Sequence, residues 1–505
     1  MRFVDQSPYW IPQDFAHENH RLTRISETRE LPPLNIDFPF SESLRSLLSG
    51  RQLLLDEVTT LYPLDVIHQH HLAGFITYEP SILSSNSKPR CLRCHQQDPT
   101  LFFSHPCARC KEECTYCRKC INMGKASSCT PIVLWCGPEA PLSLPTEPIL
   151  SWEGTLSKPQ HEASMNLVAA IKNKTSLLIW AVCGAGKTEM LFSGIEYALS
   201  KRLRVCIATP RTDVVLELVP RLKQAFSSST VAGLYGGSED RFGSAMITIS
   251  TTHQLYRYRH AFDVMIVDEV DAFPYSMDES LQKAVEHSRK KDATLIYLSA
   301  TPNKSIQAAA KRGELPMVAI SARYHAHPLP EPVPKWIGNW KKSIDRKRIP
   351  IPLQKWIIHR LTNQIPILVF VPNIPYMERL EKLLSTSTTA KIAAVHAEDP
   401  GRKERVQQMR DNQLALLLTT TILERGVTFK GVEVAVLGAE EEIFTESALV
   451  QIAGRAGRNK DFPKGNVTFF HHGYTKAILE AQAHIRQMNL DAKKKGWLLT
   501  AKKGT

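Results

Sequence analysis

The chain has 505 residues, with 63 lysines and arginines against 50 aspartates and glutamates, which gives a formal net charge of +13. This excess of positive charge favours a polyanionic partner, and nucleic acid above all, over an acidic protein. The sequence lacks the ~18 uninterrupted apolar residues of a membrane-spanning helix, and its amino terminus lacks the apolar run of a signal peptide. We therefore expect a cytoplasmic multidomain protein, at most peripheral to the inner face of the membrane.

The first 87 residues contain one helical pattern, in which apolar side chains recur at helical spacing between Leu44 and Val58. A cluster formed by His68, His70 and His71 also stands out. Adjacent histidines in a polar context are more often exposed to solvent than bound to a metal, so we expect this cluster at the surface. The role of residues 1–87 stays open.

Residues 88–136 hold nine of the 11 cysteines of the chain. Cysteines of a cytoplasmic protein stay reduced, so this block indicates metal binding and not disulfides. Each C-x₂-C knuckle presents two thiolates to one tetrahedral ion, for which zinc is the best candidate. One arrangement places a first zinc ion on Cys91, Cys94, Cys117 and Cys120 and a second, less certain one on Cys107, Cys110, Cys114 and Cys129.

A different pairing, in which the Cys91–Cys94 knuckle joins the Cys107–Cys110 knuckle, fits the spacing equally well. The block is also rich in arginine and lysine. Small basic zinc modules serve nucleic-acid binding and protein docking alike, so the sequence leaves the purpose of this module open.

A proline-rich stretch over 137–148 ends the cysteine block. Short apolar runs then alternate with helical segments in two series. The first, over 150–330, has runs at 177–182, 205–209, 264–267 and 295–298, and the second, over 353–490, has runs at 367–371, 392–396, 414–418, 434–437 and 467–470. This alternation predicts an α/β fold with two parallel sheets flanked by helices. We expect 331–352 to link the two lobes and 491–505 to form a basic tail.

The segment Ala181–Thr188 reads Ala-Val-Cys-Gly-Ala-Gly-Lys-Thr and lies between a predicted strand and a predicted helix. This context is typical of a phosphate-binding loop. Gly184 and Gly186 let backbone N–H groups turn towards the phosphates of ATP. Lys187 adds positive charge, and Thr188 is placed to ligate Mg²⁺.

Two carboxylates, Asp268 and Glu269, follow four apolar residues at the end of a predicted strand. We expect Asp268 to hold Mg²⁺, directly or through water, and Glu269 to orient and deprotonate the attacking water. Farther along, Arg455 and Arg458 lie three residues apart, as one face of a helix requires, in a segment that also carries Gln451. One or both arginines are expected to reach the γ-phosphate.

These motifs resemble those of superfamily 2 helicases of the DEAD/DEAH type, over roughly residues 150–475. The resemblance implies two RecA-like lobes, with Gln160 reading adenine and Gln451 near the nucleotide. It implies that Ser299–Thr301 couples hydrolysis to strand contact. It also implies a grip on the nucleic-acid backbone by segments that contain Thr209, Arg211, Thr252 and Thr420. The sequence Asp-Glu-Val-Asp at 268–271 departs from the commoner Asp-Glu-Ala-Asp but keeps both catalytic carboxylates.

With its amino-terminal cysteines, the chain is similar to the ComFA family of late competence ATPases. The similarity rests on Tyr116-Cys-Arg-Lys-Cys120 and on motor segments at 181–189, 267–274 and 420–428. It implies an ATPase that depends on single-stranded DNA, uses ATP, Mg²⁺ and Zn²⁺, and helps to draw transforming DNA through a membrane channel. The partners implied are ComFC and the ComEC channel.

Two other functions stay open. Replication-restart helicases such as PriA also combine helicase lobes with cysteine knuckles, but there the knuckles lie within the second lobe, whereas here they precede the first. A nucleic-acid-binding scaffold would use the ATP site only to change conformation, and steady-state ATP turnover would exclude it.

Overall fold

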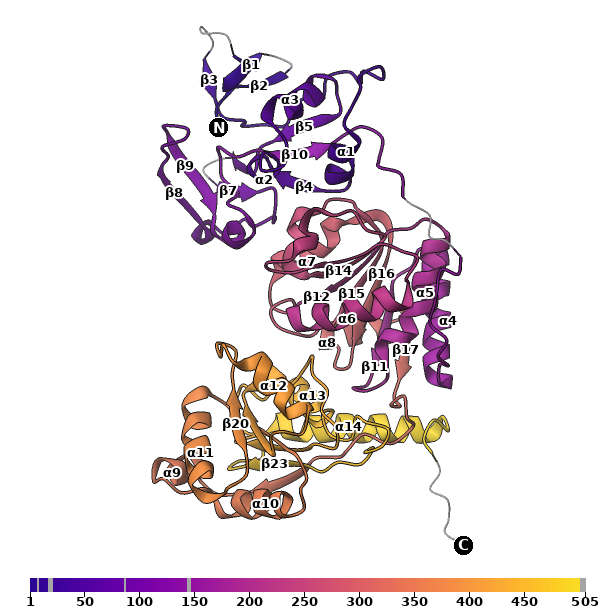
Figure 1. The fold of residues 1–505 in the computed structure, drawn as a ribbon, viewed down its shortest axis with the longest axis vertical. Helices are drawn as coiled ribbons and strands as arrows, with labels where there is room; N and C mark the ends of the chain where they lie inside the picture. Colours follow the sequence, from indigo (N-terminus) through magenta and orange to yellow (C-terminus); the bar gives the residue numbers. More distant parts are fainter. Residues whose placement is uncertain (7–8, 17–20, 86–87, 143–146, 500–505) are drawn as a thin grey trace. The chain divides into compact units, whose positions relative to one another are not determined.

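The computed structural model describes residues 1–6, 9–16, 21–85, 88–142 and 147–499. The chain divides into two compact units (Figure 1). The first consists of Met1–Glu153, Leu167–Leu177 and Phe192–Tyr297, and the second of Gly154–Asn166, Leu178–Leu191 and Leu298–Thr505. None of the helices within the described ranges is long and apolar enough to cross a lipid bilayer.

The amino-terminal part of the first unit contains two small antiparallel sheets. One has the order β2-β1-β3 and consists of β1 (Phe3–Gln6), β2 (Tyr9–Pro12) and β3 (Leu22–Thr23). The other has the order β4-β10-β5 and consists of β4 (Gln52–Leu54), β5 (Ile76–Glu79) and β10 (Ile132–Trp135). Because β10 follows the cysteine block whereas β4 and β5 precede it, residues on both sides of the block complete one sheet.

The helical pattern predicted between 44 and 58 is interrupted. Gly50, with φ +70°, follows the end of the first helix and turns the chain into β4, a conformation that glycine adopts without the cost that a Cβ imposes. Leu44 and Leu48 on that helix are fully buried and share a core with Val133 of β10. The helices of this part are α1 (Glu42–Leu48), α2 (Leu55–Val58) and α3 (Leu64–Leu72), with one 3₁₀ turn, η1 (Gln13–Phe15).

The histidine cluster lies on α3 and is buried, so the expectation of a solvent-exposed cluster is wrong. His68, His70 and His71 are each at most 5% exposed. His70 Nε2 accepts a hydrogen bond from the backbone N–H of Ser41 at 2.8 Å, and the ring of His68 stacks on that of Phe15 at 5.4 Å. The three rings therefore serve the packing of α3, which the polar local sequence did not reveal.

The cysteine block lies between β5 and β10. It forms two antiparallel strand pairs and two short 3₁₀ helices: β6 (Ile82–Ser85) with β7 (Lys88–Cys91), β8 (Phe102–Pro106) with β9 (Glu113–Cys117), η2 (Pro99–Leu101) and η3 (Arg118–Met123). Most of the cysteines lie in or next to a strand or η3, whereas Cys94, Cys110 and Cys129 lie in turns.

Lobe 1 is built on a seven-stranded sheet with the order β13-β14-β12-β15-β16-β11-β17. The four predicted apolar runs are confirmed as parts of its strands, and only residue 182 of the first run lies outside one. The strands are β11 (Leu177–Ala181), β12 (Val205–Thr209), β13 (Val231–Leu234), β14 (Ile247–Thr251), β15 (Phe262–Asp268), β16 (Arg289–Ser299) and β17 (Met317–Ile320). Every residue of β12 is buried, which explains why this strand reads as a nearly continuous apolar run.

Helices flank this sheet, as the alternating pattern predicts. They are α4 (Lys158–Asn173), α5 (Lys187–Ser200), α6 (Thr212–Ala225), α7 (Glu279–Ser288) and α8 (Lys304–Lys311), with two 3₁₀ segments, η4 (Glu239–Phe242) and η5 (Thr252–Arg257). The segment η5 directly continues β14, so the end of a buried strand fixes where η5 begins.

Lobe 2 is a six-stranded parallel sheet with the order β18-β23-β22-β19-β21-β20. The five predicted runs are confirmed as strands, and β18 is added. The strands are β18 (Val333–Trp336), β19 (Ile367–Phe370), β20 (Ile392–Val395), β21 (Leu416–Thr419), β22 (Glu433–Leu437) and β23 (Val467–His471). The other elements are α9 (Trp340–Asp345), α10 (Ile351–Thr362), α11 (Ile374–Ser387), α12 (Arg402–Arg410), η6 (Thr421–Leu423), α13 (Glu446–Ala453) and α14 (Lys476–Lys494).

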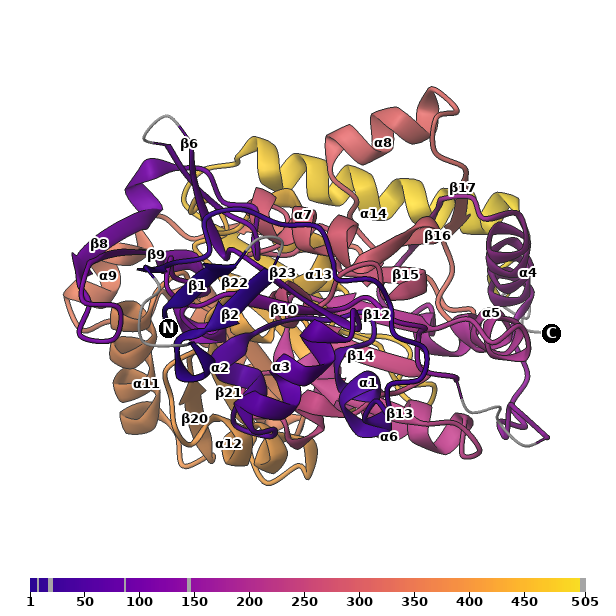
Figure 2. The same cartoon turned by 90° about the horizontal axis from the view of Figure 1, so that it is seen from above.

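Two expected boundaries differ from the structure. Residues 331–352 are not a free linker, because β18 pairs with β23 and Trp340 of α9 is 1% exposed within the core of lobe 2. The expected tail begins inside α14, which is a single long helix in both Figure 1 and Figure 2. Asp491 on this helix accepts a hydrogen bond from Ser321 Oγ at 2.9 Å, and the last residues of the tail, 500–505, lie outside the described ranges.

Acidification is expected to destabilise the amino-terminal region. Burial, with a smaller contribution from His71, lowers the pKa of His68 from 6.5 to about 4. Between these values the unfolded chain binds a proton that the folded chain does not bind, so stability falls as the pH falls from 6.5 towards 4. Thermal melting followed at pH 7 and at pH 5 should show this loss. In a His68→Gln variant the new side chain does not titrate, so this variant should lose less stability than the parent protein over the same pH interval. A loss equal to that of the parent protein would contradict the prediction.

Candidate functional site

The phosphate-binding loop lies between β11 and α5, as predicted. Gly184 and Gly186 have φ +82° and +71°, in the left-handed region that favours glycine. A Cβ at position 186 would lie 2.3 Å from Gln160 Nε2, so a larger residue would collide with that side chain. Lys187 is the first residue of α5, and Thr188 follows it with 7% exposure. The loop thus joins a helix amino terminus, which suits the phosphates of ATP.

Gln160 is 5% exposed and belongs to the same unit as this loop. Its Nε2 donates to the carbonyl of Gly186 at 3.2 Å, and its Oε1 accepts from the backbone N–H of Ser157 at 2.9 Å. These two hydrogen bonds tie the beginning of α4 to the phosphate loop. The structure therefore places Gln160 beside the nucleotide loop.

A hydrogen-bonded chain connects the phosphate loop with α13. The thiol of Cys183 donates to Gln451 Oε1 at 2.9 Å, and Gln451 Nε2 donates to Thr301 Oγ1 at 3.4 Å. The hydroxyls of Thr301 and Ser447 lie 2.8 Å apart. Three predicted motifs, the loop at 181–188, Ser299–Thr301 and the segment with Gln451, therefore meet through side chains.

The sequence did not single out Arg323, which lies 1% exposed beside the phosphate loop. A Cβ added to Gly184 would lie 3.6 Å from Arg323 Cγ. The guanidinium donates to the carbonyls of Ala456, at 2.8 Å, and Gly457. Burial and the charge of Arg458 lower the pKa of Arg323 to about 10. No motif marks this arginine; the available signal was its position three residues after the short apolar strand β17.

The acidic pair lies at the end of β15 in the first unit. Asp268 is the last residue of the strand, and its Oδ1 accepts a hydrogen bond from the backbone N–H of Glu269 at 2.8 Å. Glu269 has φ +55°, a backbone conformation that is costly for a residue with a Cβ and concentrates at functional sites. Both residues are half-buried.

The two predicted arginines do not lie on a helical face, because α13 ends at Ala453. Arg455 is 2% exposed; its Nε donates to the carbonyl of Glu424 at 2.9 Å and its Nη1 to that of Val427. Arg458 Nη1 donates to Val427 O at 3.3 Å and to Thr428 Oγ1 at 3.2 Å. Both arginines therefore hold the segment 424–428 of lobe 2.

The four residues that the helicase resemblance assigns to nucleic acid fall into two groups. Thr209 and Thr252, which end β12 and begin η5, are fully buried. Arg211, before α6, and Thr420, before η6, are partly exposed. Accessible side-chain atoms for a nucleic-acid backbone are therefore provided by the second group.

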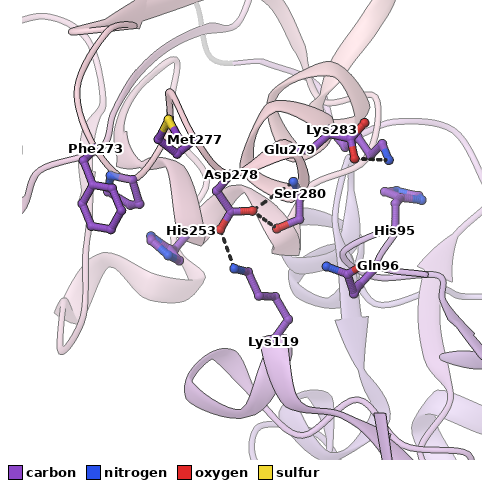
Figure 3. A pocket seen from close by; sticks show the side chains of 11 residues that line it. His95, Gln96, Lys119, His253, Phe273, Met277, Asp278, Glu279, Ser280 and Lys283 are labelled. Atoms are coloured by element: carbon purple, nitrogen blue, oxygen red, sulfur yellow. Dashed lines mark hydrogen bonds and ion pairs between the residues drawn. The ribbon is translucent and has the colours of Figure 1, made fainter. Parts of the chain in front are cut away.

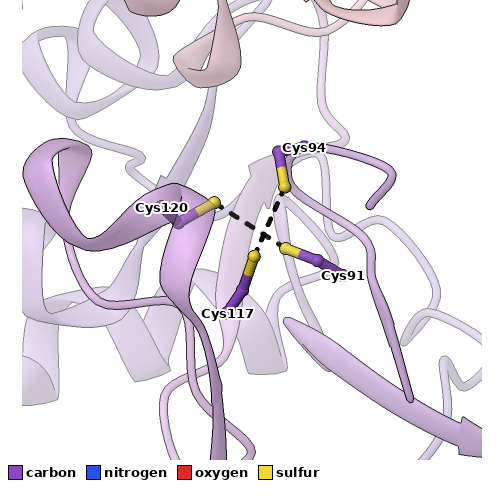
Figure 4. Close-up of side chains that lie close together, drawn as sticks. All are labelled: Cys91, Cys94, Cys117 and Cys120. Atoms are coloured by element: carbon purple, nitrogen blue, oxygen red, sulfur yellow. Dashed lines mark hydrogen bonds between the residues drawn. The ribbon is translucent and has the colours of Figure 1, made fainter. Parts of the chain in front are cut away.

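The structure brings the first predicted set of cysteines together. Cys91, Cys94, Cys117 and Cys120 are buried, with their sulfurs within 4.8 Å of one another (Figure 4). The Sγ atoms of Cys91 and Cys120 lie 3.8 Å apart, and those of Cys94 and Cys117 lie 3.6 Å apart. A tetrahedral ion with Zn–S bonds of about 2.3 Å has sulfur–sulfur edges of roughly 3.8 Å, so this donor set fits zinc.

Cys107, Cys110, Cys114 and Cys129 form a second group of the same kind. The interleaved arrangement is therefore the one observed, and the pairing of the first two knuckles is wrong. The Cys129 thiol and the Ser128 hydroxyl, which lies 3.4 Å away, lower the pKa of Cys114 to about 6 and so favour a thiolate ligand. The terminal ammonium of Met1 donates to Cys129 O at 2.7 Å, so the start of the chain is fixed to this cluster.

A cavity of about 570 Å³ is lined by residues of the cysteine block and of lobe 1 (Figure 3). His95, Gln96 and Lys119 line it from the cysteine side. The other lining residues belong to lobe 1: His253, Phe273, Pro274, Met277, Asp278, Glu279, Ser280 and Lys283. Lys119 Nζ and Asp278 Oδ2 are 2.5 Å apart, and this ion pair crosses the cavity.

Comparison with known proteins accounts for almost the whole chain. The protein-family model described as "Competence protein ComFA N-terminal domain" matches residues 33–134. "Type III restriction enzyme, res subunit" matches 153–304, and "Helicase conserved C-terminal domain" matches 353–460. The competence protein ComFA of Bacillus subtilis (strain 168) is 50% identical over 458 residues, which cover 90% of this chain and 97% of that protein. The chain belongs to the ComFA family.

A second relative is the competence protein ComFA of Streptococcus pneumoniae (strain ATCC BAA-255 / R6), with 38% identity over 75% of this chain and 86% of that protein. The replication restart protein PriA of Bacillus subtilis is 22% identical over only 30% of this chain and 21% of its own length. The ComFA family thus describes the chain better than PriA. The chain is a superfamily 2 helicase ATPase associated with competence, whose helicase domains bind nucleotide and nucleic acid and whose cysteine clusters can hold zinc.

The purified protein should contain two zinc ions per chain, one for each cysteine cluster. A Cys117→Ser variant should lose the first ion and a Cys110→Ser variant the second, because each cluster provides its own four thiolates. Elemental analysis of both variants beside the parent protein measures the stoichiometry. Cys136 lies outside both clusters, so Cys136→Ser is the matched control and should keep both ions. Unchanged zinc in the two cluster variants would contradict the assignment.

Proposed function

We propose that this chain is an ATP-driven translocase for single-stranded DNA that helps to draw transforming DNA inward during competence. The observation that carries the proposal is the hydrogen-bonded chain Cys183–Gln451–Thr301. A translocase must transmit the state of its nucleotide to the elements that hold the strand. This chain connects the phosphate loop with α13 and with the segment at the end of β16, and so supplies a route for that transmission.

The proposed hydrolysis uses residues at the carboxyl ends of β11 and β15. Lys187 would neutralise phosphate charge, while Thr188 and Asp268 would hold Mg²⁺, which neutralises charge that develops on the transferred phosphate. Glu269 would orient the attacking water and accept its proton. The glycine cradle that a Cβ at position 186 would fill supports nucleotide binding here.

The arginines of lobe 2 have different proposed roles. Arg455 is buried and holds the carbonyls of Glu424 and Val427, so it positions the segment that leads from η6. Arg458 is only partly buried and lies near the charge of Arg323, which itself lies beside Gly184. We therefore assign contact with the γ-phosphate to Arg458 and a positioning role to Arg455.

The strand contacts are proposed on charge and exposure. Arg211 and Thr420 are partly exposed and can reach backbone phosphates, whereas the buried Thr209 and Thr252 would shape the backbone of their segments. Contacts of this kind are insensitive to base sequence. The net charge of +13 supports binding to a polyanion. Membership of the ComFA family supports transforming DNA as that polyanion, with ComFC and the ComEC channel at the inner membrane face as partners.

The decisive experiment measures ATP hydrolysis by the purified protein with single-stranded DNA, duplex DNA, RNA or no nucleic acid. Single-stranded DNA is expected to stimulate more than duplex of equal length, because transforming DNA enters as one strand. Binding should weaken as the salt concentration rises. The logarithm of the binding constant should fall against the logarithm of the salt concentration with a slope of roughly −0.7 for each phosphate contact. Stimulation by RNA alone, or by neither form of DNA, would overturn the proposal.

A Glu269→Gln variant should hydrolyse ATP at least about a hundredfold more slowly while it still binds ATP and DNA, because only the group that accepts the proton of water is lost. Lys187→Ala should lose ATP binding as well, because phosphate charge is no longer neutralised. Binding of a fluorescent ATP analogue, measured beside the rate of ATP hydrolysis, distinguishes the two variants. Normal turnover by Glu269→Gln would remove the assigned role.

Arg458→Ala should reduce kcat by about 10³-fold or more and leave KM for ATP nearly unchanged, since such an arginine acts mainly in the transition state. Arg455→Ala should instead lower the melting temperature, because two buried carbonyls lose their donor. Steady-state kinetics and thermal melting of both variants provide the comparison. An equal loss in kcat and in ATP affinity for Arg458→Ala would contradict its assignment.

A further inference from the structure

The carboxylate of Glu57 on α2 lies buried among three arginines of the first unit. Its Oε2 is 2.6 Å from Arg93 Nη2, and its Oε1 is 2.8 Å from Arg257 Nε and 3.1 Å from Arg241 Nη2. The backbone N–H of Leu54 also donates to Oε2 at 3.1 Å. Burial alone would raise the pKa of Glu57, but the charges of Arg93 and Arg257 hold it below its ordinary value. The carboxylate is therefore ionised and fully engaged.

The arginines on this carboxylate come from parts of the chain with different roles. Arg93 is the third residue of the Cys91–Cys94 knuckle. Arg257 is the last residue of η5, which begins at Thr252, a residue assigned to the nucleic-acid-binding segment. Glu57 thus joins a knuckle of the first cysteine cluster to that segment through two ion pairs on one side chain.

Further hydrogen bonds make the same connection. Gln52 Nε2 donates both to the carbonyl of Arg93, at 3.1 Å, and to that of Tyr256, at 3.0 Å. Arg257 Nη2 donates to the carbonyl of Met123 at 3.2 Å, at the end of η3. The backbone of the cysteine module is therefore tied to η5 through Gln52 and through Arg257.

The second knuckle of the cluster reaches lobe 1 by an independent contact. Lys119, between Cys117 and Cys120, forms the ion pair with Asp278 that crosses the cavity in Figure 3. Asp278 caps α7 by accepting the N–H of Ser280 at 3.1 Å, and Ser280 Oγ lies 2.8 Å from Tyr256 Oη of η5. Both knuckles therefore connect with η5, one through Glu57 and the other through the start of α7.

We propose that the metal ion held by Cys91, Cys94, Cys117 and Cys120 sets the position of η5 and thereby the affinity of lobe 1 for single-stranded DNA, with Glu57 as the positioning residue. One tetrahedral ion fixes the two knuckles relative to each other, and so fixes Arg93 and Lys119. These side chains then hold η5 from two directions. The inference rests on the proposed function, because it assigns strand binding to this segment.

A purely structural role for Glu57 makes a different prediction. If the ion pairs only stabilise the fold, their loss lowers the melting temperature and affects every activity alike. If they position η5, their loss raises the DNA concentration that gives half-maximal stimulation of the ATPase and leaves the rate without DNA unchanged. The two kinetic quantities therefore distinguish the roles.

The test uses the full-length zinc-loaded protein and a Glu57→Gln variant, which keeps the shape of the side chain and removes its charge. We expect the half-stimulating concentration of single-stranded DNA and the Kd from fluorescence anisotropy to rise about five- to tenfold, in the range of a typical coupling between sites. Zinc content and the DNA-independent rate should not change. Glu79→Gln is the matched control. It breaks another ion pair between the amino-terminal region and lobe 1, that of Glu79 with Arg259 at 2.7 Å, which involves no knuckle residue.

A second variant keeps the test decisive if Glu57→Gln does not fold. Lys119→Ala breaks the more exposed contact with Asp278 and should weaken DNA binding in the same direction. Removal of zinc by a chelator should raise the Kd for DNA and increase amide hydrogen exchange across 252–257 in the parent protein. In a variant that carries both Glu57→Gln and Lys119→Ala, chelation should add little further loss, because both connections are already broken.

The outcomes separate the inference from the proposed function. If single-stranded DNA does not stimulate the parent protein, the proposed function fails. If the parent is stimulated but Glu57→Gln, Lys119→Ala and chelated protein bind DNA as the parent does, only the coupling through the metal site is overturned. The coupling would also be overturned if the DNA-independent rate of Glu57→Gln fell as much as its DNA binding, or if Glu79→Gln weakened DNA binding to the same extent. Glu57 would then have a structural role alone.

Discussion

The first unit depends on the burial of one carboxylate among arginines. Removing one partner from such a buried group typically costs about 3–5 kcal/mol, because charges remain in a medium that solvates them poorly. Glu57 lies on α2, which directly follows β4, so the ion pairs also fix the sheet that β10 completes after the cysteine block. The position of the cysteine block between β5 and β10 and the ion pairs of Glu57 therefore both fix the block within the first unit. A metal-binding module on a flexible linker would require neither the shared sheet nor these ion pairs.

Much of the motor was predictable because its signals are local. A buried parallel strand must be apolar on both faces, so the runs at 205–209 and 367–371 indicate strands without any knowledge of their neighbours. The phosphate loop was likewise marked by glycines whose positive φ values its turn requires. The grouping of cysteines into two clusters followed from knuckle spacing only as one of two possibilities, since spacing does not say which strand ends fold together.

The features that sequence reasoning missed depend on partners far along the chain. Glu57 and Arg257 are separated by two hundred residues, and neither belongs to a motif. The histidines of α3 look solvent-exposed in a polar stretch, but Phe15 and Ser41 come from other segments to cover them. The prolines and basic residues of 331–352 suggested a linker, yet the ring of Trp340 packs in the core of lobe 2 and its Nε1 donates to Glu440 Oε1 at 2.8 Å. Local composition cannot show such contacts.

The second unit concentrates positive charge where the phosphates of ATP would lie. Arg323 lies beside Gly184, and its burial together with the neighbouring charge of Arg458 lowers its pKa to about 10, which means that its protonated form is held at a cost. Two backbone carbonyls satisfy part of its hydrogen-bonding capacity but carry no net charge. An anion at the phosphate loop would offset the repulsion between the two guanidinium groups. Nucleotide binding would therefore stabilise the contact between the phosphate loop and the segment 456–458, and loss of the γ-phosphate would weaken it, as a motor that couples hydrolysis to movement requires.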